Sequence, residues 1–201
     1  MNQSDREFLD KLRESALEDL MFFSNSGRSE RERWVVSEFL RLQKIQFSAI
    51  ELCSQPVHSK VDIEFRGANF QVKEILNPGI KRHRDAKGRY EKLRSASSIE
   101  NLILPGLCYA TPPVVTIYDL ISTEADSLAS SGKYITVKSN LDLIFYVTRT
   151  RASLIKKDEI NHEHLASLGW RSISCLAGKQ AIVVFAASNA PAFLRDLSAS
   201  S

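Results

Sequence analysis

The chain has 201 residues, of which 43% are hydrophobic and 25% charged, and its formal net charge is +3 at pH 7. This composition excludes a disordered or fibrous protein, and the length favours a single domain with one substantial core. A net charge this small neither requires nor excludes a polyanionic partner, so the positions of the charges have to decide that question.

The cysteines and the amino terminus indicate a cellular location. Cys53, Cys108 and Cys175 are odd in number and contain no Cys-x-x-Cys pair, which disfavours a disulfide framework and a cysteine zinc site. The apolar surroundings of Cys53 and Cys108 predict buried thiols. The start of the chain has no apolar run long enough for a signal peptide or a membrane span. We therefore expect a cytoplasmic protein without a membrane partner.

The first 52 residues predict two helices and a strand. A Ser4-x-x-Glu7 capping pattern opens an amphipathic segment that ends at Asn25. A second capping pattern, beginning at Ser29, opens a helix that ends near Gln46, and residues 47–52 are predicted to form a strand.

Residues 60–65 and 70–75 have the alternating pattern of a β-hairpin. A two-residue turn at Gly67-Ala68 would place residue 64 opposite 71 and residue 62 opposite 73. The polar face of this hairpin then carries two carboxylates, an amide and an ammonium, from Asp62, Glu64, Gln71 and Lys73. The alternative interpretation is an amphipathic ribbon whose polar face simply meets water.

The most basic segment of the chain follows the helix and strand breaker Asn77-Pro78-Gly79. One interpretation is a solvated loop and helix face, because Asp85 and Glu91 interrupt the run. The other is a surface that contacts nucleic-acid phosphates. Its residues are Lys81, Arg82, Arg84, Lys87, Arg89 and Arg94.

The remaining pattern completes an α/β domain. It predicts a mixed, mostly antiparallel sheet flanked by helices, with an added C-terminal hairpin and helix, over residues 1–201. The predicted elements are a helix at 116–130, a strand at 141–148, a helix at 158–168, a hairpin at 172–176 and 181–186, and a helix at 190–197.

Glu38 falls inside the apolar sector of the second predicted helix, between Leu42 and Ile45. A carboxylate there must reach water, pair with a cation or bind a metal, because burying an isolated charge is costly. A helix acid, an acid before a strand and a Gln-x-Lys in the next strand could hold Mg²⁺ beside a phosphodiester. The metal would polarise the phosphoryl oxygen, and Lys73 would stabilise the developing charge.

On these residues the chain resembles the PD-(D/E)XK nuclease superfamily, whose signature is an acid followed by an acid-x-Lys in the next strand. Asp62 and Gln71-Val72-Lys73 match this signature, and Glu38 matches the glutamate that the first core helix often supplies. The superfamily core runs helix, three strands, helix, strand, and the resemblance covers about residues 29–148, leaving 149–201 as an extension. The whole chain looks most like a small bacterial family labelled only as putative endonucleases. The resemblance implies a Mg²⁺- or Mn²⁺-dependent hydrolase that cleaves DNA.

Gln71 departs from the superfamily pattern, because a neutral amide is a weaker Mg²⁺ ligand than a carboxylate. Related nucleases tolerate this exchange when another acid enters the site, and the predicted register would allow Glu64 to do so.

Two other functions remain open from the sequence. The first is an inactive nuclease fold that still binds nucleic acid through the basic segment. The second is a protein-interaction domain that docks through residues 8–23, for which a homodimer would be one sign.

Overall fold

A computed structural model describes residues 3–102 and 113–200 of the chain. The chain forms two compact units, where the sequence predicts one domain. The first unit combines Met1–Arg31 with Pro78–Thr111, and the second combines Glu32–Asn77 with Pro112–Ser201.

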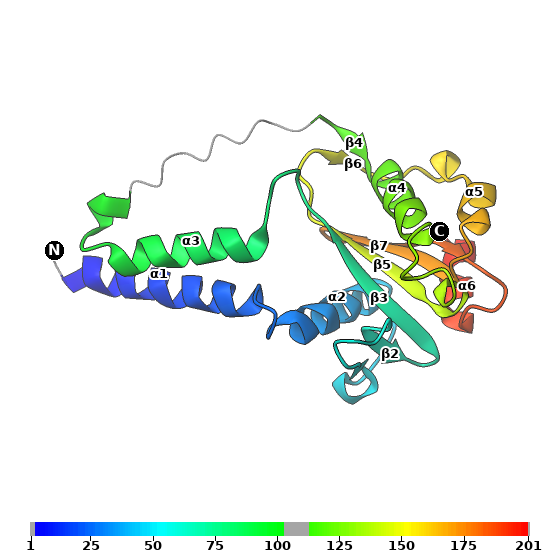
Figure 1. Ribbon diagram of the computed structural model, residues 1–201, viewed down its shortest axis with the longest axis horizontal. Helices are drawn as coiled ribbons and strands as arrows, with labels where there is room; N and C mark the ends of the chain where they lie inside the picture. The colour runs from blue at the N-terminus through cyan, green and yellow to red at the C-terminus, as the bar shows by residue number, and fades with distance from the viewer. Residues whose placement is uncertain (1–2, 103–112, 201) are drawn as a thin grey trace. The chain divides into compact units, whose positions relative to one another are not determined.

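The first unit is built on two helices that lie side by side, α1 (Gln3–Phe22) and α3 (Arg82–Ser95) (Figure 1). Leu9 and Ala16 of α1 share a small apolar core with Leu93 and Ala96. The Arg13 guanidinium donates to the carbonyl oxygens of Leu93 at 3.1 Å and Ala96 at 2.7 Å, and so satisfies acceptors at the end of α3. A short 3-10 turn, Ile99–Leu102, follows.

The second unit contains a six-stranded mixed sheet in the order β1-β2-β3-β5-β7-β8. The central pairs β3–β5 and β5–β7 are parallel, and the three outer pairs are antiparallel. A separate two-stranded parallel sheet joins β4 (Val115–Thr116) to β6 (Ala152–Ser153). The strands of the main sheet are β1 (Cys53–Ser54), β2 (Ile63–Phe65), β3 (Ala68–Ile75), β5 (Asp142–Val147), β7 (Ser172–Ala177) and β8 (Gln180–Ala186).

Helices cover both faces of this sheet. On one face, Phe39 of α2 (Arg28–Leu42) and Leu194 of α6 (Ala192–Ser200) pack with Phe70 of β3. On the other face, α4 (Ile117–Ala129) and α5 (His162–Ser167) pack with β5 and β7. The predicted fold class is therefore confirmed: a mixed sheet flanked by helices, consistent with a restriction-endonuclease-like fold, with an added C-terminal hairpin and helix.

Three local predictions are wrong. Residues 47–52 do not form a strand, because Ala49–Glu51 is a 3-10 turn in which the Glu51 carboxylate accepts from the Ser48 N–H at 2.7 Å. The second helix ends at Leu42 instead of Gln46, and Lys44 has a positive φ of 57°. The helix predicted at 158–168 is shorter, since α5 begins at His162 after a 3-10 turn at Lys157–Glu159.

The thiol prediction is wrong for Cys53, which is exposed, and Cys108 lies outside the described residues. Cys175 is buried, and burial raises the pKa of its thiol to about 12 because the thiolate would lose its hydration. Within the described ranges, no helix is both long and apolar enough to cross a membrane.

Candidate functional site

The turn between β2 and β3 sets the geometry of the candidate site. Its central residues are Arg66 and Gly67, with φ of 43° and 79°, and Phe65 pairs with Ala68. Two positive φ values identify the tight hairpin turn that matches strand twist, and Gly67 adopts its conformation at little cost. The Arg66 guanidinium is fixed by the Glu51 carboxylate at 2.8 Å. The predicted turn at Gly67-Ala68 is therefore wrong.

Because the turn lies one residue earlier than predicted, Asp62 and not Glu64 lies opposite Gln71. Glu64 pairs with Asn69 instead of Gln71, and its side chain is exposed. Asp62, directly before β2, lies against Gln71 instead of Lys73. The division into an apolar and a polar face survives the correction, because a shift by an even number of residues leaves each side chain on its own face.

Asp62, Gln71 and Tyr134 form a buried polar chain. The Gln71 Nε2 donates to Asp62 Oδ2, and the Tyr134 hydroxyl donates to Gln71 Oε1 at 3.2 Å. The Val72 N–H donates to the same Asp62 oxygen at 2.8 Å. Asp62 is 3% exposed and Gln71 1%. The Asp62 carboxylate thus satisfies a main-chain donor and a side-chain donor inside the protein.

Lys73 lies on the same face as Gln71, and its ammonium is 5.6 Å from the centroid of the Tyr134 ring. Tyr134 therefore contacts both polar members of the Gln-x-Lys motif. Sequence reasoning missed this residue, since Tyr134 is 63 positions from Gln71 and follows α4 in a turn with no motif of its own. Only the packing of that turn on the sheet reveals its role.

The structure does not bring Glu38 to Asp62. Phe39 contacts Phe70 on the face that α2 covers, while the next strand residue, Gln71, points to the opposite face and contacts Tyr134. The Glu38 carboxylate instead accepts hydrogen bonds from Arg41, the shortest at 2.7 Å. These bonds lower the pKa of Glu38 below its usual value. Pairing, one of the outcomes that the sequence allows for this acid, is the one observed.

The arrangement of these side chains does not fit Mg²⁺ as it stands. Mg²⁺ requires six oxygen ligands in a nearly octahedral arrangement and usually keeps several waters. Here Gln71 presents a nitrogen to Asp62, and both side chains are almost fully buried. Over residues 3–102 and 113–200, no three His, Cys, Asp or Glu side chains are grouped so that they could hold a metal. A cation could enter only if the Gln71 amide turned.

The predicted basic residues form a helical surface in the first unit. Arg84, Lys87, Arg89 and Arg94 of α3 are exposed, as is Lys81 before the helix, whereas Arg82 is half-buried against the Phe23 ring at 5.0 Å. The segment 81–94 carries seven Lys and Arg against two acids, so the remainder of the chain is net negative by two. A cavity of about 530 Å³ opens on this surface, lined by Phe23, Arg82, Arg84, Arg89 and Lys92 among others.

Three ion pairs compensate this surface only in part. Arg84 contacts Asp85 at 3.6 Å, Lys87 contacts Glu91 at 3.9 Å, and Arg89 contacts Asp19 at 2.9 Å. All six side chains are at least about one third exposed, so these pairs are weak and their cations remain accessible to a second anion. The surface is therefore electrostatically suited to a polyanion.

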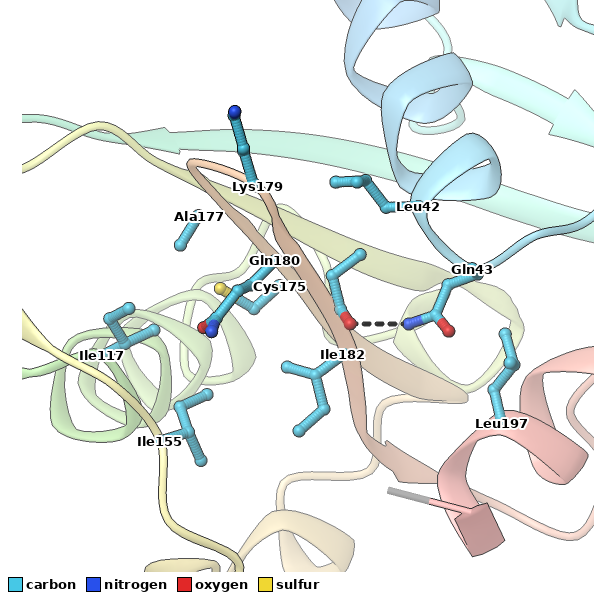
Figure 2. Close-up of a pocket in the computed structure, with 11 residues that line it drawn as sticks. Leu42, Gln43, Ile117, Ile155, Cys175, Ala177, Lys179, Gln180, Ile182 and Leu197 are labelled. Atoms are coloured by element: carbon cyan, nitrogen blue, oxygen red, sulfur yellow. Dashed lines mark hydrogen bonds between the residues drawn. The ribbon is translucent and has the colours of Figure 1, made fainter.

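A second cavity, of about 480 Å³, lies beside the edge strand β8 and is lined mainly by apolar side chains (Figure 2). The Gln43 Nε2 donates to the Ala181 carbonyl oxygen at 2.7 Å and thereby covers one acceptor of this edge. None of the site residues predicted from the sequence lines this cavity. It is separate from the polar chain at Asp62.

Asp142 at the start of β5 shows how the second unit satisfies a fully buried carboxylate. It is 0% exposed and forms an ion pair with Arg171. It also accepts from the Ser172 hydroxyl at 2.8 Å and the Asn69 N–H at 2.8 Å. These contacts join β3, β5 and β7 at one end of the sheet, which indicates a structural role for Asp142.

Comparison with known proteins now places the chain in a family. The chain belongs to the family described as "Putative endonuclease, protein of unknown function (DUF1780)", whose model matches residues 4–200. No curated protein matches the chain.

One similar solved structure comes from Pseudomonas aeruginosa strain PAO1 and is described as a protein of unknown function of the monooxygenase superfamily. The two structures have a TM-score of 0.58 and 22% sequence identity, over 98% of this chain and 93% of that one. This similarity shows a shared fold.

Proposed function

We propose that this protein acts on the phosphodiester backbone of DNA: it binds the backbone through the basic surface of α3 and hydrolyses it at the strand face that carries Asp62, Gln71 and Lys73. The observation that carries the proposal is the concentration of basic charge on α3, in a chain that is otherwise net negative. The family description supports an endonuclease, and the PD-(D/E)XK resemblance supports the choice of residues.

The binding half of the proposal follows from exposure and charge. A polyanion gains affinity from each Lys or Arg that neutralises a phosphate, because counterions leave the nucleic acid. The long side chains of Arg84 and Lys87 reach away from α3 into water and can follow a phosphate backbone without displacing core residues. The expected binding is therefore independent of sequence and decreases steeply with salt.

The binding half is tested by fluorescence anisotropy of a labelled DNA duplex at several salt concentrations. The double variant Arg84→Ala/Lys87→Ala should weaken binding and reduce the slope of log K against log [salt] by about two. The matched control is Lys179→Ala/Arg195→Ala, which removes the same charge from exposed positions of the second unit. Equal losses in both variants would mean that net charge alone, and not α3, attracts the DNA.

The hydrolytic half assigns a role to each polar residue of the strand face. Asp62 and Gln71 would hold a Mg²⁺ or Mn²⁺ cofactor only after the Gln71 amide has turned its oxygen toward Asp62, and the bound cation would then supply Lewis-acid chemistry. Lys73 would stabilise charge that develops on the phosphate. Glu38 is left out of this ligand set because α2 packs on the opposite face. Glu64 is exposed beside Asn69 and is a further acid that a bound phosphodiester and cation could recruit.

The hydrolytic half is tested by nicking of supercoiled plasmid with Mg²⁺ or Mn²⁺. Activity that Lys73→Met abolishes, while duplex binding to α3 is unchanged, would support hydrolysis at this face. Activity that survives in both Lys73→Met and Asp62→Asn would place the reaction elsewhere or assign it to a contaminant. Binding without any cleavage by the wild-type protein favours the second candidate function, a nuclease-fold module that only binds nucleic acid, for which the closed Asp62–Gln71 pair is the specific observation.

A further inference from the structure

We infer that the side-chain amide of Gln71 takes the place of a divalent cation at Asp62, and that Tyr134 is the positioning residue that holds the amide there. The inference deepens the proposed function, since it concerns the same strand face and states what a cation must displace. It is tested on metal binding alone, without nucleic acid, so that its outcome is independent of binding or cleavage of DNA.

The orientation of the Gln71 amide is fixed at both ends. Its Nε2 donates to the Asp62 carboxylate, and its Oε1 accepts from the Tyr134 hydroxyl at 3.2 Å. The reversed amide would place an acceptor oxygen against a carboxylate, and two acceptors repel each other. The nitrogen therefore faces Asp62, and the amide dipole supplies the positive charge density that a cation would otherwise supply.

Burial makes the hydrogen bond from Gln71 to Asp62 costly to break. Asp62, Gln71 and Tyr134 are all no more than 3% exposed. Hydrogen bonds that a buried carboxylate accepts are costly to remove, because no water replaces the lost donor. The Asp62 oxygen that accepts from Gln71 also accepts from the Val72 N–H at 2.8 Å. A cation that binds this oxygen must therefore displace the Gln71 amide.

Tyr134 is rigidly held, which makes it suited to position the amide. Its ring packs edge-to-face on Trp170, with centroids 5.6 Å apart, and the Trp170 Nε1 donates to the Ala125 carbonyl oxygen of α4 at 3.0 Å. The Lys73 ammonium lies 5.6 Å from the centroid of the same ring. Tyr134 thus connects α4 to the whole Gln-x-Lys motif, and its hydroxyl controls which amide atom faces Asp62.

The decisive experiment is calorimetric titration of Mn²⁺ into the wild-type protein and into Gln71→Glu. The variant replaces the blocking nitrogen with a second carboxylate oxygen beside Asp62, which is the ligand type that hard cations prefer. We expect the variant to bind Mn²⁺ at least ten-fold more tightly than the wild type. The double variant Asp62→Asn/Gln71→Glu should lose this gain. Gln180→Glu, which adds the same charge at an exposed position of β8, is the matched control and should bind Mn²⁺ no more tightly than the wild type.

Thermal unfolding gives a second readout of the same inference. Without metal, Gln71→Glu should unfold at a lower temperature than the wild type, because two buried carboxylates repel each other. Mn²⁺ should restore that loss in the variant at concentrations that stabilise the wild type much less, since a ligand stabilises the native state in proportion to its affinity for it. A wild-type protein that binds Mn²⁺ as tightly as Gln71→Glu would overturn the inference, as would a folded Gln71→Glu that binds none.

Tyr134→Phe tests the positioning role and also covers the case in which Gln71→Glu does not fold. The variant keeps the ring that packs on Trp170 and removes only the hydroxyl that fixes the amide. With Gln71 free to turn its oxygen toward Asp62, Mn²⁺ affinity should rise above that of the wild type. Unchanged Mn²⁺ affinity in Tyr134→Phe would remove Tyr134 from the inference.

Discussion

The polar side chains of the strand face at Asp62 are buried and hydrogen-bonded to one another, whereas those of the α3 surface are exposed and weakly paired. On the strand face, Asp62, Gln71 and Tyr134 satisfy one another at 3% exposure or less. On α3, the side chains of Arg84 and Lys87 are more than 60% exposed and have weak partners at 3.6 and 3.9 Å. The buried chain can be disturbed only at a cost in stability, whereas the exposed charges are available to an anionic partner.

This contrast shows that a match to a motif and a chemically open site are separate properties. The acid and the Gln-x-Lys lie on one face as the motif requires, yet Gln71 is already hydrogen-bonded to Asp62 and to Tyr134. The basic residues match no motif, yet their exposed side chains present positive charge to solvent along α3.

The largest effect is expected at the buried ion pair of Asp142 and Arg171. Asp142→Ala leaves the Arg171 charge and the Ser172 hydroxyl without their acceptor inside the sheet, and should cost about 3–5 kcal/mol. Urea unfolding followed by circular dichroism measures the loss. The control is Asp85→Ala on α3, whose exposed partner is Arg84, and which should change stability by less than about 1 kcal/mol. Similar losses for the two variants would contradict the contrast drawn here.

A smaller loss is expected at Asp62. Asp62→Ala removes the acceptor of the Gln71 amide and of the Val72 N–H, and should cost about 1–3 kcal/mol in the same urea experiment. Glu64→Ala changes an exposed carboxylate two residues away and should stay within about 0.5 kcal/mol. If Asp62→Ala proved as mild as Glu64→Ala, the Asp62 carboxylate would be reachable by water and open to a cation.

The smallest effect is expected at the surface pair of Glu38 and Arg41, in which the two side chains are 27% and 63% exposed. The hydrogen bonds from Arg41 lower the pKa of Glu38 from 4.5 in the folded protein. The pair therefore stabilises the fold above the unfolded pKa, and this contribution is lost as the pH falls through the lowered folded value. Arg41→Ala should change the free energy of unfolding only slightly at pH 7, because an exposed ion pair contributes little.

The pH dependence of the Arg41→Ala effect tests whether the stabilisation by Arg41 depends on ionised Glu38. The difference in unfolding free energy between wild type and variant should shrink as the pH is lowered below 4.5, where Glu38 becomes protonated. A difference that grew toward acid pH would show that Arg41 stabilises the fold through another group.

Much of the fold follows from local sequence patterns. Alternation in residues 60–75 predicts the hairpin and its two faces, helical spacing predicts α1 and α4, and an apolar run predicts β5. These patterns succeed because the periods of strands and helices determine which side chains can be buried together. They fail where a single turn residue decides the outcome. Arg66 takes a positive φ that its residue type disfavours, and this moves the register by two residues.

The candidate site was likewise predictable from the sequence only in part. The sequence alone determined which residues carry charge or hydrogen-bonding groups, that Asp62, Gln71 and Lys73 share a face, and that basic charge concentrates at 81–94. Only the tertiary structure decided that α2, the helix of Glu38, packs on the other side of the sheet and that Tyr134 completes the chain with Gln71. The physical reason is that strand alternation fixes a side chain's face locally, while the helix or turn that covers each face is chosen by packing between segments distant in sequence.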